Sequence, residues 1–251
     1  MSEDDRNTTH FGYEQVARDR KSERVRDVFA SVAPRYDLMN DLMSLGLHRI
    51  WKRLAMSLLA PAPGEAVLDL AAGTGDLTEQ LVRRVGDTGR VVMSDINEAM
   101  LGRGRDRLLD HGLARGVDYV LADAEHLPFA SGSFDAVCIG FGLRNVTDQR
   151  AALTEMHRML RPGGRALVLE FSRPVLPGLT PLYDWYSFNV LPQLGRWVAG
   201  DADSYRYLAE SIRMHPDQAT LRELMQQSGF ARCQYYNLTG GIVAIHRGYR
   251  I

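Results

Sequence analysis

The chain has 251 residues, 45% of them hydrophobic and 24% charged, which is ordinary for a soluble globular protein with one large α/β domain. Its 30 basic and 31 acidic residues leave a formal net charge of -1, which argues against a strongly basic nucleic-acid-binding protein. The composition thus favours a protein that acts on small molecules, with no nucleic acid as partner.

The cysteines and the N-terminus indicate the compartment. Two cysteines, Cys138 and Cys233, cannot form a disulfide framework, so a reducing environment is expected. The start MSEDDRNTTH lacks the apolar core of a signal peptide, and no apolar run approaches the length of a membrane span. We expect a cytoplasmic protein whose membrane contact, if it has one, is peripheral on the inner face.

The first sixty residues are predicted to form a tail and a helical segment on the substrate side of the main domain. Residues 14–33 have the pattern of a charged amphipathic helix, which Pro34 ends. Residues 35–60 again show helical spacing of Leu, Met, Ile and Trp. The run PAPGE at 61–65 marks a boundary, so the main domain is expected to span 61–251.

Beyond this boundary, strand patterns alternate with helix patterns. Strands are predicted at 66–71, 90–96, 117–123, 134–142 and 165–172, with a turn at 161–164, and helices at 76–86, 97–111, 149–160 and 216–228. This alternation is typical of an α/β fold with a doubly wound parallel sheet. Residues 231–251 are predicted to add two antiparallel strands around Thr239, Gly240 and Gly241.

An insertion at 174–200 interrupts the alternation. It contains four prolines, two tryptophans, two tyrosines and one phenylalanine. A segment this apolar is expected to form a lid or a wall of the substrate site rather than part of the sheet.

The stretch VLDLAAGTGDLTEQL, residues 67–81, runs from an apolar strand through a glycine turn into a helix. Such turns cradle nucleotide-containing cofactors, and Gly73 and Gly75 lack the Cβ atoms that would keep a cofactor from the backbone. Thr78 occupies the position of the third glycine of the dinucleotide-binding fingerprint. The incomplete fingerprint argues against NAD or FAD.

Two carboxylates follow neighbouring strands. Asp95 ends the second strand, where a carboxylate can accept hydrogen bonds from both ribose hydroxyls. Asp123 follows the third strand and could accept from an adenine amino group, while the N–H of Ala124 reaches a ring nitrogen. The loop has no basic residue for a pyrophosphate. S-adenosylmethionine, which carries adenosine without phosphate, therefore fits best.

These motifs resemble those of a known family. VLDLAAGTGD, SDINEAML, ADAEHLPF, SFDAVCIGFGLRNVTD and MLRPGGRALVLEFS resemble the successive motifs of class I S-adenosylmethionine-dependent methyltransferases, which have a Rossmann-like seven-stranded sheet. VFASVAPRYDLMNDLMSLGLHRIWK, GFGLRNVTD and DADSYRYLAESIRMHPDQ more narrowly resemble the quinone C-methyltransferases of ubiquinone and menaquinone synthesis. The similarity covers nearly the whole chain and implies the bacterial form that serves both pathways.

The resemblance implies the activity and the cofactor contacts. The expected reactions convert demethylmenaquinol to menaquinol and 2-polyprenyl-6-methoxy-1,4-benzoquinol to its methylated product. Cofactor contacts are implied for Thr74, Asp95, Asp123 and Ala124. The family usually has a serine at the position of Gly140, so a contact there is expected to come from the backbone.

Methylation of a ring carbon needs a phenol, with a pKa of about 10, to lose its proton so that the carbon becomes nucleophilic. Arg144 and Asn145 follow the fourth strand at the sheet edge where ligands bind in α/β folds. We assign Arg144 the electrostatic stabilisation of the phenolate, directly or through a water, because an arginine stays protonated. Asn145 is expected to orient Arg144, and Tyr36 to line the substrate pocket.

Other residues before the middle of the chain are expected to have structural roles. By their ordinary pKa, His48 and His126 could accept the proton, but a lone histidine is more often structural, and neither is assigned. Asp37 and Asn40 suit a helix cap, and Met39, Met43 and Leu47 at helical spacing suit a core. No residues have metal-ligand spacing, so no metal is predicted.

Three alternatives stay open at this point. They are a methyltransferase of another small phenol or lipid, a non-catalytic binding module, and a dinucleotide oxidoreductase. The expected partner is a polyprenyl quinol, with a multi-enzyme assembly or a homodimer left open. A membrane-facing tunnel mouth in the insertion would use its aromatic residues Trp185, Tyr186, Phe188 and Trp197.

Overall fold

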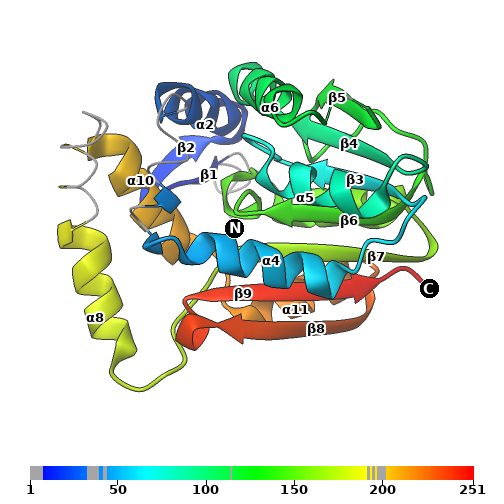
Figure 1. Ribbon diagram of the computed structural model, residues 1–251. Helices are drawn as coiled ribbons and strands as arrows, with labels where there is room; N and C mark the ends of the chain where they lie inside the picture. Colours follow the sequence, from blue (N-terminus) through cyan, green and yellow to red (C-terminus); the bar gives the residue numbers. More distant parts are fainter. Residues whose placement is uncertain are drawn as a thin grey trace.

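The computed structural model describes residues 8–32, 40–41, 44–113, 115–190, 193, 196 and 202–251. Its centre is a seven-stranded sheet with the strand order β5-β4-β3-β6-β7-β9-β8 (Figure 1). The strands are Ala66–Leu70 (β3), Arg90–Asp95 (β4), Val117–Leu121 (β5), Phe134–Gly140 (β6), Leu160–Phe171 (β7), Ala231–Leu238 (β8) and Val243–Tyr249 (β9). The strands β3 to β7 are parallel, whereas β9 is antiparallel to both β7 and β8. The predicted α/β sheet with an antiparallel C-terminal addition is therefore confirmed.

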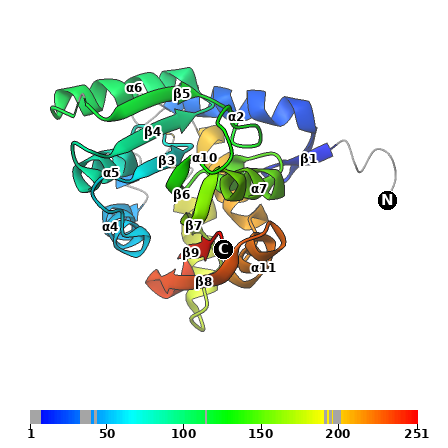
Figure 2. The ribbon, with the colours of Figure 1, turned by 90° about the vertical axis from the view of Figure 1, so that its right-hand side faces the viewer.

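Helices cover both faces of this sheet (Figure 2). On one face, Leu47–Leu59 (α4) and Asp76–Val85 (α5) pack on strand residues such as Val67 and Cys138. On the other face, Gln149–Met159 (α7) and Gln218–Gln227 (α11) pack on alternate strand residues such as Leu68 and Val137. Because the central strands are buried on both sides, they read as continuous apolar runs. Helix Glu98–Asp110 (α6) covers the end of the sheet near β4 and β5.

The N-terminal segment differs from its prediction. Helix α2 spans Arg18–Val32, whereas Glu14–Ala17 (β2) pairs with Thr8–Phe11 (β1) in an antiparallel hairpin. The helix therefore begins four residues after the start that the sequence predicted. The hairpin is stabilised by tertiary contacts, because Phe11 stacks on Tyr207 at 4.1 Å between ring centroids and the Tyr13 N–H donates to Glu210 at 3.1 Å.

Strand β7 is also longer than predicted. The RPGG run at 161–164 was expected to be a turn, but it continues the strand, and Leu160 pairs with Phe134. The register shifts between Phe134 and Ala136, so the extra residues are accommodated by a bulge in the sheet. Gly163 carries a positive φ of +84° within this bulge, which a glycine tolerates at little cost.

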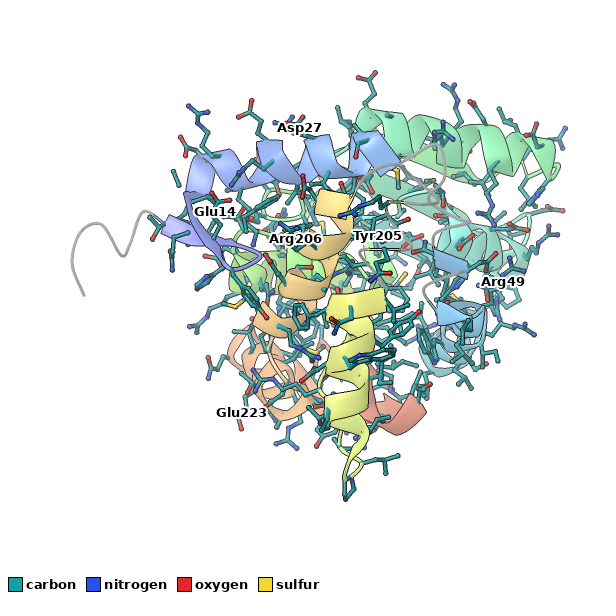
Figure 3. All side chains as sticks on the ribbon, turned by 90° about the vertical axis from the view of Figure 1, so that its left-hand side faces the viewer. Glu14, Asp27, Arg49, Tyr205, Arg206 and Glu223 are labelled. Atoms are coloured by element: carbon teal, nitrogen blue, oxygen red, sulfur yellow. The ribbon has the colours of Figure 1, made fainter. Side chains whose placement is uncertain are left out.

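The segment after β7 forms helices beside the sheet. Leu179–Trp185 (α8) continues into the π-helical turn Tyr186–Val190 (η3), and Ala202–Met214 (α10) was not predicted as an element. Figures 1 and 3 show α8 at the side of the molecule next to α10, away from the sheet. Arg213 of α10 forms an ion pair with Asp184 of α8 and lies over the Tyr183 ring at 5.2 Å. Several predicted residues fall outside the described part of the chain, namely Tyr36, Asp37, Met39, Met43 and Trp197.

Candidate active site

The glycine turn between β3 and α5 is closed by a buried hydrogen bond. Gly73 and Gly75 take left-handed φ angles of 58° and 82°. Thr78, which replaces the third glycine of the dinucleotide fingerprint, donates its hydroxyl to Asp69 at 2.6 Å, and both side chains are fully buried. Burial raises the pKa of Asp69 to about 6, although the hydrogen bonds from Thr78 and Cys138 oppose it. Thr78 thus ties the start of α5 to β3.

A pocket opens at the carboxyl ends of the parallel strands, beside this turn. Its walls include five of the predicted cofactor residues, which are Gly73, Asp95, Asp123, Ala124 and Gly140. Helix α2 covers it with Val25, Arg26 and Phe29. The space between the walls, open mouth included, is about 810 Å³. We call it the cofactor pocket.

Asp95 is held in one orientation by the main chain. Its Oδ2 accepts the N–H of Gly73 at 2.8 Å, and its Oδ1 accepts the N–H of Asn97 at 2.8 Å. Burial raises the pKa of Asp95, and these backbone hydrogen bonds oppose that shift. Each carboxylate oxygen accepts more than one hydrogen bond. The residue therefore retains capacity for two hydroxyl groups, as a ribose requires.

A third carboxylate, which the sequence analysis did not single out, lies in the same wall. Glu125 accepts the N–H groups of Thr147 and Asp148 at 2.9 and 3.0 Å and lines the pocket with Asp95 and Asp123. Its signal in the sequence is its position two residues after Asp123. Three carboxylates favour a cationic ligand. These residues thus fit S-adenosylmethionine, a sulfonium cation with a ribose.

Thr74, Gly75 and Gly140 were also predicted to contact the cofactor, and the structure places them differently from one another. Thr74 is buried, and neither Thr74 nor Gly75 lines the cofactor pocket. Gly140 does line it, and a Cβ added there would lie 2.6 Å from Cδ1 of Leu77. The absence of a side chain at Gly140 therefore leaves room for Leu77, and only the backbone of Gly140 is available to a ligand.

A second cavity, the aromatic pocket, adjoins the first. Its lining includes the aromatic residues Phe29, Trp51, Phe141, Phe171 and Tyr207. The rings of Phe141 and Phe171 lie 4.9 Å apart, and Trp51 is anchored by its Nε1–H, which donates to Thr239 at 2.9 Å. Phe29 and Phe141 line both pockets. A planar ring in the aromatic pocket would therefore lie next to a ligand in the cofactor pocket.

Arg144 is a buried cation that lines the aromatic pocket and is not a surface residue. Its side chain is 4% exposed, and its Nη1 donates to Glu170 Oε1 at 2.9 Å and to the Phe141 carbonyl. The guanidinium lies over the Phe171 ring at 5.4 Å. In the part of the chain that the structure describes, its buried Nε has no hydrogen-bond partner. A buried cation with an unused N–H is suited to stabilise an anionic oxygen.

Asn145 is connected to a different residue from the one predicted. Its side chain was expected to orient Arg144, but its Oδ1 accepts the hydroxyl of Tyr207 at 3.1 Å, and Asn145 itself lines the cofactor pocket. Burial raises the pKa of Tyr207 far above its usual 10, so the hydroxyl stays protonated and donates. Asn145 thus connects the wall of one pocket to the wall of the other.

The two candidate histidines are separated by the fold. His48 of α4 lines the aromatic pocket together with Lys52, Asn40 and Ser44. His126 lines neither pocket, and its N–H closes a tight turn onto the carbonyl of Asp123 at 3.0 Å. The helical spacing of α4 gave no means of distinguishing its pocket-facing residues from its core residues.

The insertion does not form a pocket wall in its described part. Among the described side chains of 174–181, 183–190, 193 and 196, none lines either pocket. Instead, Trp185 is 60% exposed, and Val175 and Leu176 are each 55% exposed. The lid or substrate wall expected over 174–200 therefore stays a prediction.

Comparison with known proteins agrees with this geometry. Residues 17–250 match the model of the ubiE/COQ5 methyltransferase family. The chain is 57% identical over 250 residues to the ubiquinone/menaquinone biosynthesis C-methyltransferase UbiE of Klebsiella pneumoniae, covering 100% of both chains. It is 59% identical over 244 residues to the protein of the same name from Teredinibacter turnerae, covering 97% of this chain and 98% of the other.

Solved structures show the same fold at low identity. One is a SAM-dependent methyltransferase of Thermotoga maritima, possibly acting on histamine, with a TM-score of 0.63 at 19% identity, covering 90% of this chain and 99% of the other. Another is a SAM-dependent methyltransferase of Aquifex aeolicus, with a TM-score of 0.59 at 14% identity, covering 80% and 89%. The family match over nearly the whole chain and the fold lead to one conclusion. This chain belongs to the ubiE/COQ5 methyltransferase family and is a C-methyltransferase that uses S-adenosylmethionine.

Proposed function

We propose that this protein methylates a ring carbon of polyprenyl hydroquinols in both menaquinone and ubiquinone synthesis. Its substrates would be demethylmenaquinol and 2-polyprenyl-6-methoxy-1,4-benzoquinol. The names of the full-length relatives support the two pathways. The observation that carries the chemistry is Arg144, a buried cation in an aromatic pocket that adjoins the cofactor pocket.

Asp95, Asp123 and Glu125 are the residues that would hold the cofactor, together with the backbone of Gly73 and Gly140. S-adenosylmethionine supplies an electrophilic methyl group when it is bound. Carboxylates around a sulfonium cation favour its binding by direct attraction. The main-chain hydrogen bonds to Asp95 orient the carboxylate before the ligand arrives, which lowers the cost of binding.

The aromatic pocket would position and activate the quinol. Its rings pack on the faces of a planar substrate, and this holds the ring carbon beside the cofactor pocket. Arg144 would stabilise the phenolate oxygen through its Nε–H, which is buried and has no hydrogen-bond partner among the described residues. Glu170 fixes the guanidinium, so the donor is in place before the charge develops.

The most direct test of the activity is mass spectrometry of the quinone pool in cells that lack the protein. We expect the unmethylated precursors of both quinones to accumulate, and expression of the chain to restore the methylated products. Accumulation in only one pathway would reduce the proposal to that pathway. Normal pools in the deleted cells would reject the quinol substrates, and titration of the pure protein with S-adenosylhomocysteine and with NADH would still test the cofactor.

A membrane contact is the second part of this proposal, because a polyprenyl tail resides in a bilayer. No helix among the described residues is long and apolar enough to cross a membrane. Exposed apolar side chains near α8, which are Val175, Leu176 and Trp185, would instead lie in the lipid headgroup region. Assembly with other enzymes or with a second copy of the chain stays a prediction.

Liposome flotation tests the contact with a matched pair of variants. Leu176→Ala/Trp185→Ala removes two exposed side chains beside α8, whereas Leu109→Ala/Leu121→Ala removes two exposed leucines at the opposite edge of the sheet. We expect only the first variant to lose flotation and to lose activity on long-tailed quinols while keeping it on short-tailed ones. Equal flotation of both variants and the wild type would contradict a contact at α8.

A further inference from the structure

Helix α4 projects a histidine into the aromatic pocket. Its buried face carries His48, Trp51 and Lys52, and all three line that pocket with Arg144. His48 is 7% exposed. On the outer face of the same helix, Arg49 points to solvent, as Figure 3 shows. The helix therefore presents an imidazole to the pocket, where the substrate ring would bind.

Hydrogen bonds define which imidazole nitrogen carries the proton. The hydroxyl of Ser44 donates to the carbonyl of Asn40 at 2.6 Å, so its hydrogen is already used. The same oxygen lies 2.8 Å from His48 Nδ1 and can only accept there. While the Ser44 hydroxyl donates to Asn40, the matching tautomer of the neutral ring carries its hydrogen on Nδ1. This tautomer leaves the lone pair on Nε2, the atom that would accept a proton.

The charges around His48 favour a neutral ring that can become charged during a reaction. Burial, and after it the charge of Lys52, lowers the pKa of His48 below its usual value, and Asp76 and Asp41 oppose this shift. Lys52 is itself paired with Asp76 at 2.5 Å, and Asp41 is paired with Arg49. The Asp41 carboxylate lies 3.6 Å from Nε2, close enough to attract the imidazolium once it forms.

We propose that His48 is the general base of the reaction, accepting the phenolic proton of the hydroquinol on Nε2. This inference rests on the proposed function. The O–H bond of the phenol breaks, a new N–H bond forms on His48, and the electron pair stays on the oxygen, where Arg144 stabilises it. The ring carbon would then form a bond to the methyl group of S-adenosylmethionine while the bond from this methyl group to sulfur breaks, and S-adenosylhomocysteine leaves. The same carbon then loses its hydrogen to water as a proton, which restores the aromatic ring and the phenolate. The imidazolium returns its proton to the phenolate, so one proton leaves per turnover.

Kinetics of three variants on a short-tailed naphthohydroquinol test the proposal. His48→Gln should lower kcat by about 100-fold or more, the usual contribution of a general base, while the affinity for S-adenosylhomocysteine is kept. The wild type should lose kcat/KM at acid pH as His48 gains a proton, and the variant should lack that limb. Its rate should instead rise toward the phenol pKa of about 10. Imidazole added to His48→Ala should restore part of the rate. His126→Gln is the matched control and should behave as the wild type.

A second readout does not depend on turnover. In nitrogen-15 NMR of the protein without substrate, the imidazole signals of His48 are those that disappear in His48→Gln. We expect these signals to show the tautomer that is protonated on Nδ1. Ser44→Ala should mix the two tautomers and lower kcat less than His48→Gln does. If His48→Gln does not fold by circular dichroism, Ser44→Ala and the imidazole rescue decide the question.

The outcomes separate the two proposals. If the wild type does not methylate quinols, the proposed function fails whatever His48 does. If the wild type is active and folded His48→Gln keeps more than a third of kcat, His48 is not the base. An Nε2-protonated tautomer in the NMR spectrum overturns the assignment of the accepting atom. If His48→Gln has the same pH profile as the wild type and a higher KM for the quinol, His48 only shapes the pocket.

Discussion

The cofactor pocket and the aromatic pocket share a wall but are built in different ways. The first is formed mainly by loops at the carboxyl ends of β3 to β6, and main-chain N–H groups hold all three of its carboxylates, Asp95, Asp123 and Glu125. The second is formed by side chains from α2, α4, β7, α10 and the short helix Leu143–Asn145 (η2). Its buried Arg144 is paired with one carboxylate, Glu170 of β7, and also donates to the carbonyl of Phe141.

Because of this difference, we expect the two pockets to control different properties, namely cofactor affinity and the rate of the chemical step. A pocket whose polar groups are fixed by the backbone tolerates changes elsewhere in the chain, so its own residues should govern cofactor affinity. A pocket assembled from distant side chains depends on their mutual packing, so its residues should govern stability and the chemical step. Four variants can break or sharpen this comparison, and they are ordered from the largest expected effect to the smallest.

Glu170→Gln should have the largest effect, because it leaves the Arg144 charge buried without its partner. Loss of one member of a buried pair costs about 3–5 kcal/mol, so the melting temperature should fall by on the order of 10 °C. Thermal and urea unfolding measure both quantities. Glu223→Gln, an exposed glutamate on α11 labelled in Figure 3, is the control. If Glu170→Gln loses no more unfolding free energy than Glu223→Gln does, Glu170 does not stabilise Arg144.

Asp95→Ala should weaken the binding of S-adenosylhomocysteine tenfold or more, since a hydrogen bond to a charged group contributes about 1.5–3 kcal/mol. The substitution also leaves the N–H groups of Gly73 and Asn97 without their acceptor. Isothermal titration measures the affinity, with exposed Asp106→Ala as the control. Unchanged affinity in a folded Asp95→Ala variant would rule out the ribose contact.

Arg144→Lys keeps the charge but loses the planar fork of donors, which the pair with Glu170 and the Nε–H both require. We expect turnover to fall about tenfold or more while cofactor affinity is retained, because a donor aimed at the developing phenolate is misplaced. Steady-state kinetics with titration of S-adenosylhomocysteine measure the two separately. If turnover and affinity fall by equal factors, the role of Arg144 is structural.

Tyr207→Phe should have the smallest effect. It removes the hydroxyl that donates to Asn145 but keeps the ring that stacks on Phe11. The lost hydrogen bond is worth about 1 kcal/mol, so a severalfold drop in kcat/KM is expected with little change in cofactor affinity. A drop of more than about 100-fold would instead give the hydroxyl a direct part in the chemistry.

Much of the sheet and of the cofactor pocket was predictable from the sequence because both depend on local patterns. Apolar strand runs alternating with amphipathic helices determine a doubly wound sheet, and residues at strand ends gather at one edge of it. Asp95, Asp123 and Ala124 were therefore placed in one pocket without knowledge of the tertiary structure, whereas Gly140 was implied by the family resemblance. The two C-terminal strands followed from a short turn between two strand patterns.

Only the tertiary structure decided the aromatic pocket and the elements around it. Residues 14–17 have a helical pattern but form a strand, because contacts of the hairpin with α10 outweigh the local preference. Trp51 of α4 lies more than a hundred residues before Phe171 of β7 and Tyr207 of α10 in the sequence. A helical apolar stripe also looks the same whether it faces a core or a cavity. The tautomer of His48 likewise depends on which acceptor the hydroxyl of Ser44 donates to. That acceptor is determined by the three-dimensional structure, because the spacing of residues in the sequence does not encode it.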